Sequence, residues 1–144
     1  MNIASLQYSL KNKTLEIYLS GCLGTCNNCQ NSELKDFSIG KDYKQYFDKL
    51  CKKNKSGMVD NYWILGGDPI DQDYDNLLDL LSFLHKFNKP IWLWTRYELY
   101  DIPSSIKSLC AYVKTGEYVE YLPEYIDEKT GIKLASNNQK IFKI

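Results

Sequence analysis

The chain has 144 residues and a mass of 16.8 kDa, the size of one ordinary domain and well short of the roughly 250 residues of a complete (β/α)₈ barrel. Eighteen Lys and Arg residues balance eighteen Asp and Glu residues, so no overall basic field supports nucleic-acid binding. Hydrophobic residues make up 44% and aromatic residues 14% of the chain, a composition that predicts a folded rather than a disordered protein.

Neither a membrane span nor a leader segment is predicted. No window approaches the roughly 18 uncharged apolar residues that a span requires, and the first residues lack the apolar core of a signal peptide. Of the five cysteines, three lie within eight residues, which suits metal or redox chemistry in a reducing compartment better than a disulfide framework. We therefore expect a cytoplasmic protein that binds neither a membrane nor nucleic acid.

The first two predicted elements are the strands of a hairpin. Polar and apolar residues alternate over 14–19, which places Leu15, Ile17 and Leu19 on one face, as in a half-buried strand. The segment 3–10 is strand-like as well, and Lys11-Asn12 lies between the two segments as a turn.

Two helices and a strand are predicted next. From 42 to about 52, apolar residues recur at steps of three and four, which predicts a helix with the stripe Tyr43, Tyr46, Phe47, Leu50 and Cys51. The run 62–65 is a short buried strand that stops at 66–69. The segment 73–87 has the clearest helical period, with the expected buried stripe Leu77, Leu78, Leu81, Leu84 and Phe87.

The alternation of strands and helices continues beyond Pro90. Residues 91–95 form a predicted strand, residues 98–109 are weakly helical with an interruption at Pro103, and residues 110–114 form a further strand. Such alternation predicts parallel strands joined by right-handed crossovers.

The expected fold class is a single small α/β domain over residues 1–144, with mostly parallel strands in three layers or in a partial (β/α) barrel. Residues 117–138 show little periodicity, and residues 141–144 are either a final strand or a helix end. No linker and no second domain are indicated.

The strongest functional signal is a cysteine cluster directly after the second predicted strand. Cys22, Cys26 and Cys29 are separated by three and then two residues in a loop rich in Gly and Asn. Thiolates are soft ligands that suit zinc or an iron–sulfur cluster, and close spacing lets one segment wrap a metal centre with little strain. The pattern predicts a metal site.

The identity of the metal stays open on spacing alone. A closed zinc site takes four protein ligands, and the candidates for a fourth, Cys51, Cys110 and His85, lie on predicted core or helix faces. A four-iron cluster held by three thiolates leaves one iron open, as catalysis requires. An iron–sulfur cluster is the favoured hypothesis, with zinc and chance clustering as the alternatives.

The segment Gly66-Gly67-Asp68-Pro69, taken alone, is an ordinary turn. Its position changes its interpretation, because it follows a predicted strand at the end where α/β proteins bind ligands. Two glycines let a ligand lie against the backbone, while Pro69 holds Asp68 extended.

The remaining candidates lie at strand ends or on helices. Thr95 and Lys114 end the third and fourth parallel strands, so four loops are expected to converge on one face, although a lysine that ends a strand is more often a solvated edge. Cys51 and Cys110 are expected in the core, and His85 near a helix end is structural or exposed. The lysines are predicted to form a solvated helix end, with a partner-docking patch as the alternative; they are Lys49, Lys52, Lys53 and Lys55.

The cysteine spacing and the 66–69 segment together resemble the radical S-adenosylmethionine enzymes. The chain is most similar to the small activating enzymes of anaerobic ribonucleoside-triphosphate reductase, which share its short length, the GGDP form of the second motif and an Asn-Gln near the C-terminus, here Asn138-Gln139. The resemblance covers residues 18–142, and only the cysteine motif is specific by itself. Asn28 departs from an aromatic residue that is frequent in the superfamily, and Arg96 departs from a Gly that is usual in the activases.

The resemblance implies two cofactors and their sites. It implies that Cys22, Cys26 and Cys29 hold a [4Fe-4S] cluster whose open iron binds S-adenosylmethionine, and that 66–69 receives the amino group of the methionine moiety. Lys114 is the candidate partner of the methionine carboxylate. Cofactor contacts are expected from Asn28, Cys29, Gln30, Gly66, Gly67, Asp68, Pro69, Thr95 and Lys114.

The implied activity is that of a glycyl-radical activating enzyme. Such an enzyme reductively cleaves S-adenosylmethionine to a 5′-deoxyadenosyl radical, which takes hydrogen from a glycine of the anaerobic ribonucleotide reductase large subunit. A flavodoxin- or ferredoxin-type protein is the expected electron donor, and no catalytic residue beyond the cluster ligands is expected. The alternatives are a radical S-adenosylmethionine enzyme acting on another peptide or small molecule, and a non-catalytic zinc-binding interaction module.

Overall fold

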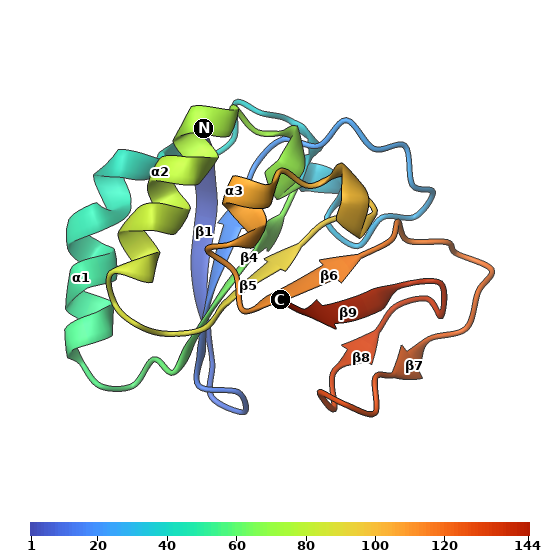
Figure 1. Ribbon diagram of the computed structural model, residues 1–144. Helices are drawn as coiled ribbons and strands as arrows, with labels where there is room; N and C mark the ends of the chain where they lie inside the picture. Colours follow the sequence, from blue (N-terminus) through green and yellow to red (C-terminus); the bar gives the residue numbers. More distant parts are fainter.

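A computed structural model describes residues 1–144 as one central sheet with helices packed against it (Figure 1). The seven strands of the sheet have the order β3-β1-β2-β4-β5-β6-β9. The four central strands are mutually parallel: β2 (Thr14–Leu19), β4 (Asn61–Gly66), β5 (Ile91–Trp94) and β6 (Tyr112–Thr115). Their carboxyl ends therefore meet at one edge of the sheet.

Antiparallel strands extend the sheet on both sides. On one side β1 (Asn2–Ser9) pairs with β2, and β3 (Lys41–Asp42) pairs with β1. On the other side β9 (Lys140–Lys143) pairs with β6. The segment between β6 and β9 forms a separate hairpin of β7 (Tyr125–Ile126) and β8 (Lys133–Leu134).

Three helices connect the parallel strands. They are α1 (Phe47–Lys55), α2 (Tyr74–His85) and α3 (Ser104–Lys107), and their apolar residues pack into one common core with the strands. Figure 1 shows all three on the same side of the sheet. The helices therefore cover one face, so the three-layer alternative, which needs helices on both faces of the sheet, is wrong.

The predicted hairpin, the four alternating strands and the helix over α2 are confirmed. The first helix begins later than its periodicity predicts, because residues 43–46 form a 3₁₀ turn that the Asp42 side chain caps by accepting from Lys44 N. The weakly helical stretch divides at Pro103 into a 3₁₀ turn and the short α3. The chain is thus a small α/β domain whose central strands are parallel.

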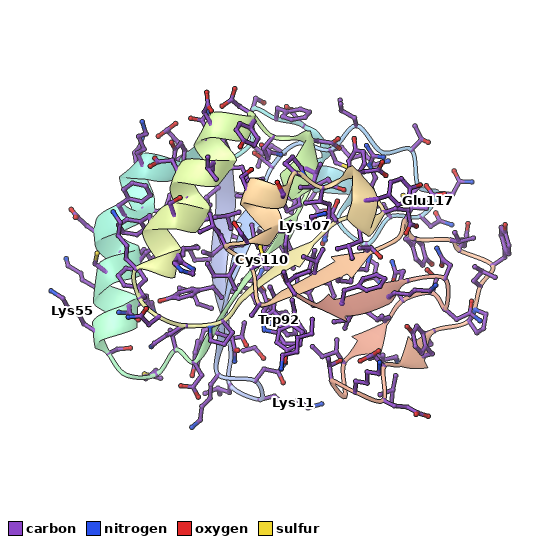
Figure 2. The ribbon with its side chains drawn as sticks, in the orientation of Figure 1. Lys11, Lys55, Trp92, Lys107, Cys110 and Glu117 are labelled. Carbon is purple, nitrogen blue, oxygen red and sulfur yellow. The ribbon has the colours of Figure 1, made fainter.

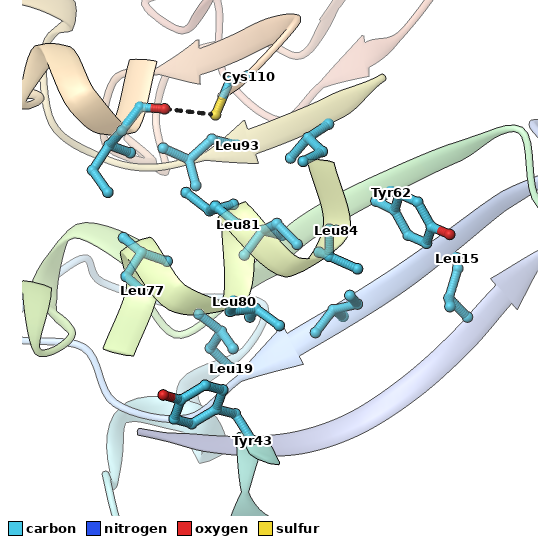
Figure 3. Close-up of a cluster of buried hydrophobic side chains, with 14 of the residues drawn as sticks. Leu15, Leu19, Tyr43, Tyr62, Leu77, Leu80, Leu81, Leu84, Leu93 and Cys110 are labelled. Atoms are coloured by element: carbon cyan, nitrogen blue, oxygen red, sulfur yellow. Dashed lines mark hydrogen bonds between the residues drawn. The ribbon is translucent and has the colours of Figure 1, made fainter. Parts of the chain in front are cut away.

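The core lies between the sheet and the helices (Figure 3). Alternate residues of the parallel strands enter it, among them Ile17, Ile64 and Leu93, all fully buried. From α2, Leu80 is fully buried although the predicted stripe omitted it, whereas Leu78 is only partly buried. Cys110 is buried as predicted, and its thiol donates to Ile106 O at 3.4 Å.

The opposite face of the sheet carries a row of half-buried aromatic residues. Trp63 lies 4.8 Å from Trp94 and 5.9 Å from Trp92 between ring centroids, and Trp92 stacks on Tyr112 at 4.0 Å. Figure 2 shows Trp92 on the side away from the helices, while Cys110 lies under α3. No helix in the structure combines the length and the apolar character needed to cross a membrane.

Candidate functional site

A cavity of about 310 Å³ lies where the four parallel strands end. Cys22 follows β2, Gly66 ends β4, Thr95 follows β5 and Lys114 lies in β6, and all four line this cavity. The parallel register produces this convergence, because Leu19 pairs with Gly66 and Trp94 with Lys114 across neighbouring strands. In α/β proteins, ligands bind at the edge of the sheet where the parallel strands end.

All three clustered cysteines line the cavity as free thiols. Their loop is held at its start by the backbone, since Gly21 N donates to Leu34 O at 2.7 Å and Cys22 N to Lys35 O at 3.2 Å. Further along, Asn28 adopts a positive φ of 50° and its amide donates to Glu120 in the segment after β6. The loop is thereby tied down at both ends.

The Cys22 sulfur already has a polar environment. Burial raises the pKa of this thiol, the hydrogen bond from Gly24 N to Sγ at 3.2 Å opposes the rise, and the charges of Asp68 and Asp71 add to it. In this conformation no three His, Cys, Asp or Glu side chains form a finished metal-ligand set. The three sulfurs thus share one cavity without being closed into a site.

The two glycines of the 66–69 segment allow the strand end to touch the cysteine loop. A Cβ on Gly67 would lie 2.2 Å from Gly21 O, and one on Gly66 would lie 2.5 Å from Leu19 O. Gly66 also has a φ of +113°, which L-residues with side chains rarely adopt. Glycine is therefore required at both positions for backbone packing.

The Asp68 side chain crosslinks the loops after β4 and β5. It is 2% exposed, and its carboxylate accepts from Thr95 Oγ1 at 2.7 Å, Arg96 N at 2.9 Å and Ile70 N at 2.9 Å. Burial raises the pKa of this carboxyl, and these hydrogen bonds oppose the rise. As predicted, the residue before Pro69 is extended, with φ −128° and ψ 123°.

Thr95 lines the cavity, but its hydroxyl is already engaged. Its Oγ1 donates to Asp68 and also accepts from Tyr97 N at 3.2 Å. The side chain therefore holds the two loops together.

Lys114 is a buried cation at the cavity wall. It is 9% exposed, and its Nζ donates to Gly116 O at 2.8 Å. Burial lowers the pKa of Lys114 to about 8, against a partial rise from the charges of Asp68 and Cys26. The interpretation as a solvated strand edge is wrong for this residue, because β9 continues the sheet beyond it.

The C-terminal Asn-Gln signature closes the wall beside Lys114. Gln139 is 4% exposed, accepts from Ala135 N at 3.1 Å and donates to Gly116 O at 3.3 Å, the same carbonyl that Lys114 contacts. Asn138 donates to Glu117 O at 2.9 Å. Gln139 thus lines the cavity and connects the backbone at Ala135 to the backbone at Gly116.

Not every predicted site residue reaches the cavity. Cys29, Gln30, Gly67 and Asp68 line it together with the residues above, whereas Asn28 is exposed and Pro69 is buried in the following 3₁₀ turn, and neither is among the lining residues. Three other candidates lie elsewhere: half-buried Cys51 on α1, buried Cys110 and exposed His85.

The predicted lysine patch on α1 lies away from the cavity. In Figure 2, Lys55 at the end of α1 and Glu117, which lines a neighbouring hollow together with Cys26, occupy opposite ends of the molecule. The four lysines of the patch are exposed, as expected of a solvated helix end.

Sequence reasoning missed the polar cluster of Arg96, Asp71 and Tyr97 as a part of the site. Arg96 lines the cavity and forms an ion pair with Asp71 at 3.0 Å, and Tyr97 OH donates to Asp71 at 2.7 Å. The available signal was composition, since Arg96 is the only arginine among the eighteen Lys and Arg residues.

Comparison with known proteins identifies the family. Residues 13–142 match the family described as a 4Fe-4S single cluster domain. The chain belongs to this family.

Two relatives are similar over most of their length, and both are named anaerobic ribonucleoside-triphosphate reductase-activating protein. The protein from Vibrio cholerae is 28% identical over 119 residues, which are 77% of this chain and 76% of the relative. The protein from Haemophilus influenzae is 25% identical over 119 residues, which are 72% and 73% of the two chains. No solved structure matches the chain.

The residues of this 4Fe-4S single cluster domain fit an iron–sulfur cluster. Three free thiols face one cavity, and thiolates are the usual ligands of such clusters. Two cavity-lining side chains also carry buried donors without an acceptor in the chain, Trp94 Nε1 and Arg96 Nε. Buried donors are normally satisfied, so the cavity wall is suited to a group that accepts hydrogen bonds.

Proposed function

We propose that this chain is a radical S-adenosylmethionine enzyme that generates the glycyl radical of anaerobic ribonucleotide reductase. The observation that carries the proposal is the convergence of Cys22, Cys26 and Cys29 with the ends of β4, β5 and β6 on one cavity. The named relatives support the choice of partner, because both are activating proteins of that reductase. The domain over residues 1–144 is proposed to be of the radical S-adenosylmethionine type.

In this proposal Cys22, Cys26 and Cys29 hold a [4Fe-4S] cluster, and the fourth iron takes no protein ligand. When bound with S-adenosylmethionine, the cluster supplies one electron, which cleaves the sulfonium to methionine and a 5′-deoxyadenosyl radical. A flavodoxin- or ferredoxin-type protein is the proposed source of that electron. The chain itself contributes ligation and the anchoring of the cysteine loop to the carboxyl ends of the strands.

The chain's other residues bind and orient S-adenosylmethionine. Gly66 and Gly67 line the cavity and are proposed to contact the methionine moiety, while Lys114 faces the carboxylate of that moiety as a buried cation. A carboxylate beside the ammonium would offset the cost of burying that charge. Asp68 and Thr95 contribute by fixing the loops around the cofactor, since their polar atoms already bond to each other.

The roles proposed for Asn28, Cys29, Gln30 and Pro69 are local. Cys29 and Gln30 line the cavity and are proposed to contact the cofactor directly. Asn28 acts indirectly, because its amide binds the cysteine loop to Glu120. Pro69 also acts indirectly, because it begins the 3₁₀ turn that positions Asp68.

The sheet face without helices is the proposed entrance for the substrate. A partial barrel with one open side admits a glycine-bearing loop of a large partner protein, as required if the reductase is the substrate. The chemistry needs no acid or base from the chain, and the only histidine, His85, is exposed on α2 away from the cavity lining. The protein's work is therefore ligation, orientation and exclusion of water.

Anaerobic reconstitution with iron, sulfide and a reductant tests the proposal. We expect about four irons and four sulfides per chain, release of 5′-deoxyadenosine from S-adenosylmethionine, and a glycyl radical signal when the reductase is added. Cys26→Ala should abolish the cluster and the cleavage. Cys51→Ala, which removes a half-buried thiol outside the cavity, is the matched control and should retain both.

Other outcomes would replace the proposal. One zinc per chain without sulfide would indicate the interaction module instead. Cleavage of S-adenosylmethionine without any radical on the reductase would indicate a different peptide or small-molecule substrate. Full cleavage activity in Cys26→Ala would contradict the ligand assignment.

A further inference from the structure

The only arginine of the chain is held rigidly at the cavity. Arg96 Nη2 donates to Asp71 Oδ1 at 3.0 Å, to Asp71 Oδ2 at 3.3 Å and to Tyr97 OH at 2.8 Å. The guanidinium carbon also lies 4.2 Å from the centroid of the Tyr97 ring. A planar guanidinium held on one nitrogen and over one ring has little freedom, which a lysine could not reproduce.

Asp71 connects this guanidinium to the cysteine loop. Its side chain is 1% exposed, and besides Arg96 and Tyr97 it accepts from the backbone N–H of Leu23 at 2.7 Å. Leu23 directly follows Cys22, so one buried carboxylate fixes both the arginine and the start of the metal-binding segment. The position of Arg96 relative to Cys22 is therefore set by a shared partner.

The buried Nε of Arg96 and the Cys22 sulfur lie on either side of Gly24. A Cβ built on Gly24 would lie 3.0 Å from Arg96 Nε and 3.1 Å from Cys22 Sγ, so both atoms border the same small space. Arg96 Nε is buried and has no hydrogen-bond acceptor in the chain, the nearest carboxylate oxygen being Asp68 Oδ2 at 3.8 Å. Cys22 Sγ already accepts from Gly24 N at 3.2 Å, and a thiolate sulfur can accept more than one hydrogen bond.

We propose that Arg96 is a positioning residue that donates its Nε–H to the sulfur of Cys22 when that sulfur is a metal ligand, with Asp71 and Tyr97 holding it in place. The inference rests on the proposed ligation by Cys22, Cys26 and Cys29. Reduction makes an iron–sulfur cluster more negative, so hydrogen bonds to its sulfurs stabilise the reduced form more than the oxidised form. These hydrogen bonds therefore raise the reduction potential of the cluster. Arg96 thereby makes the bound cluster easier to reduce.

The test is a one-electron redox titration of the reconstituted protein, poised with dithionite through mediators and followed by the electron paramagnetic resonance of the reduced cluster. Arg96→Met keeps the length of the side chain but removes its donors. We expect the ratio of reduced to oxidised cluster at a fixed potential to fall about tenfold, which equals a shift of about 59 mV to lower potential. A structural role alone would not move this quantity.

Two further variants separate the hydrogen bond from charge and from folding. Arg96→Lys keeps the positive charge without the fork and should shift the potential as Arg96→Met does. Tyr97→Phe keeps Arg96 and the ring but removes one of its holding bonds, and should give about a threefold change in the same direction. Lys107→Met, which removes a cation bonded to Leu99 O outside the cavity, is the matched control and should give no shift.

A second readout uses the metal-free protein. Hydrogen exchange at the Leu23 amide should be faster in Arg96→Met than in the wild type, because Asp71 loses the partner that orients it. Equal potentials in wild type, Arg96→Met and Tyr97→Phe would overturn the inference, as would wild-type behaviour of Arg96→Lys. These results would leave the proposed function intact, whereas a wild-type protein that takes up no iron and sulfide would end the proposed function itself.

Discussion

Replacement of the buried Lys114 by methionine should stabilise the metal-free protein while weakening its affinity for S-adenosylmethionine. Lys114 is 9% exposed, and its one hydrogen bond in the chain is to Gly116 O. Methionine fills a similar length without a charge. Binding-site residues often lower the free energy of unfolding of the ligand-free protein, because their charge is paired only when the ligand is bound.

The magnitude follows from the pKa of Lys114, which burial lowers from 10.5 to about 8. At about 1.36 kcal/mol per unit, the charged side chain disfavours folding by roughly 3 kcal/mol. Loss of its hydrogen bond offsets about 1–2 kcal/mol of the gain. The variant should therefore be about 1–2 kcal/mol more stable at pH 7, and a chain of this length should melt roughly 3–6 °C higher.

The lowered pKa of Lys114 predicts how the stability difference between wild type and Lys114→Met changes with pH. Between about pH 8 and pH 10.5 the unfolded chain holds more protons on Lys114 than the folded chain, so wild-type stability rises with pH over this window and is lost as pH falls through about 8. The advantage of Lys114→Met should be full at pH 7 and should reverse to a loss of about 1 kcal/mol at pH 10.5, where the charge penalty has nearly vanished and only the lost hydrogen bond to Gly116 O remains.

Thermal melts of wild type, Lys114→Met and Lys140→Met at several pH values test this reasoning. Lys140 is an exposed lysine on β9, and its replacement should change the melting temperature little at any pH. Equilibrium binding of S-adenosylmethionine to the reconstituted proteins should be about tenfold weaker for Lys114→Met. A gain in melting temperature that is equal at pH 7 and pH 10.5, or no gain at all, would refute the assignment of a buried charge.

Two further predictions concern the cavity walls. Gly67→Ala should cost about 2–4 kcal/mol in urea denaturation, because its Cβ would meet Gly21 O at 2.2 Å. Gly57→Ala has no atom within 4 Å and should lose only about 1–2 kcal/mol to its positive φ, so equal losses would contradict the steric argument. Gln139→Leu should cost about 2–4 kcal/mol and speed hydrogen exchange at Ala135, since it unpairs buried backbone groups; unchanged exchange there would mean that the wall is held otherwise.

Local pattern was sufficient for most elements of the fold. The period-2 alternation of β2 and the leucine spacing of α2 reflect which side chains face the core, and both elements form where predicted. The start of α1 was missed because Tyr43 enters the core from a 3₁₀ turn, which presents nearly the same apolar spacing as a helix. The β7–β8 hairpin was missed because two-residue strands carry no detectable period.

The sequence by itself determined the cysteine spacing, the glycines after β4 and the alternation that makes the central strands parallel. These are local properties, because thiol spacing, backbone freedom and side-chain period are written in consecutive residues. Only the tertiary structure decided that the Thr95 hydroxyl serves Asp68, that Lys114 is buried and that Arg96 reaches the cysteine loop through Asp71. Each of these contacts depends on how neighbouring strands or loops are brought together, which no single segment encodes.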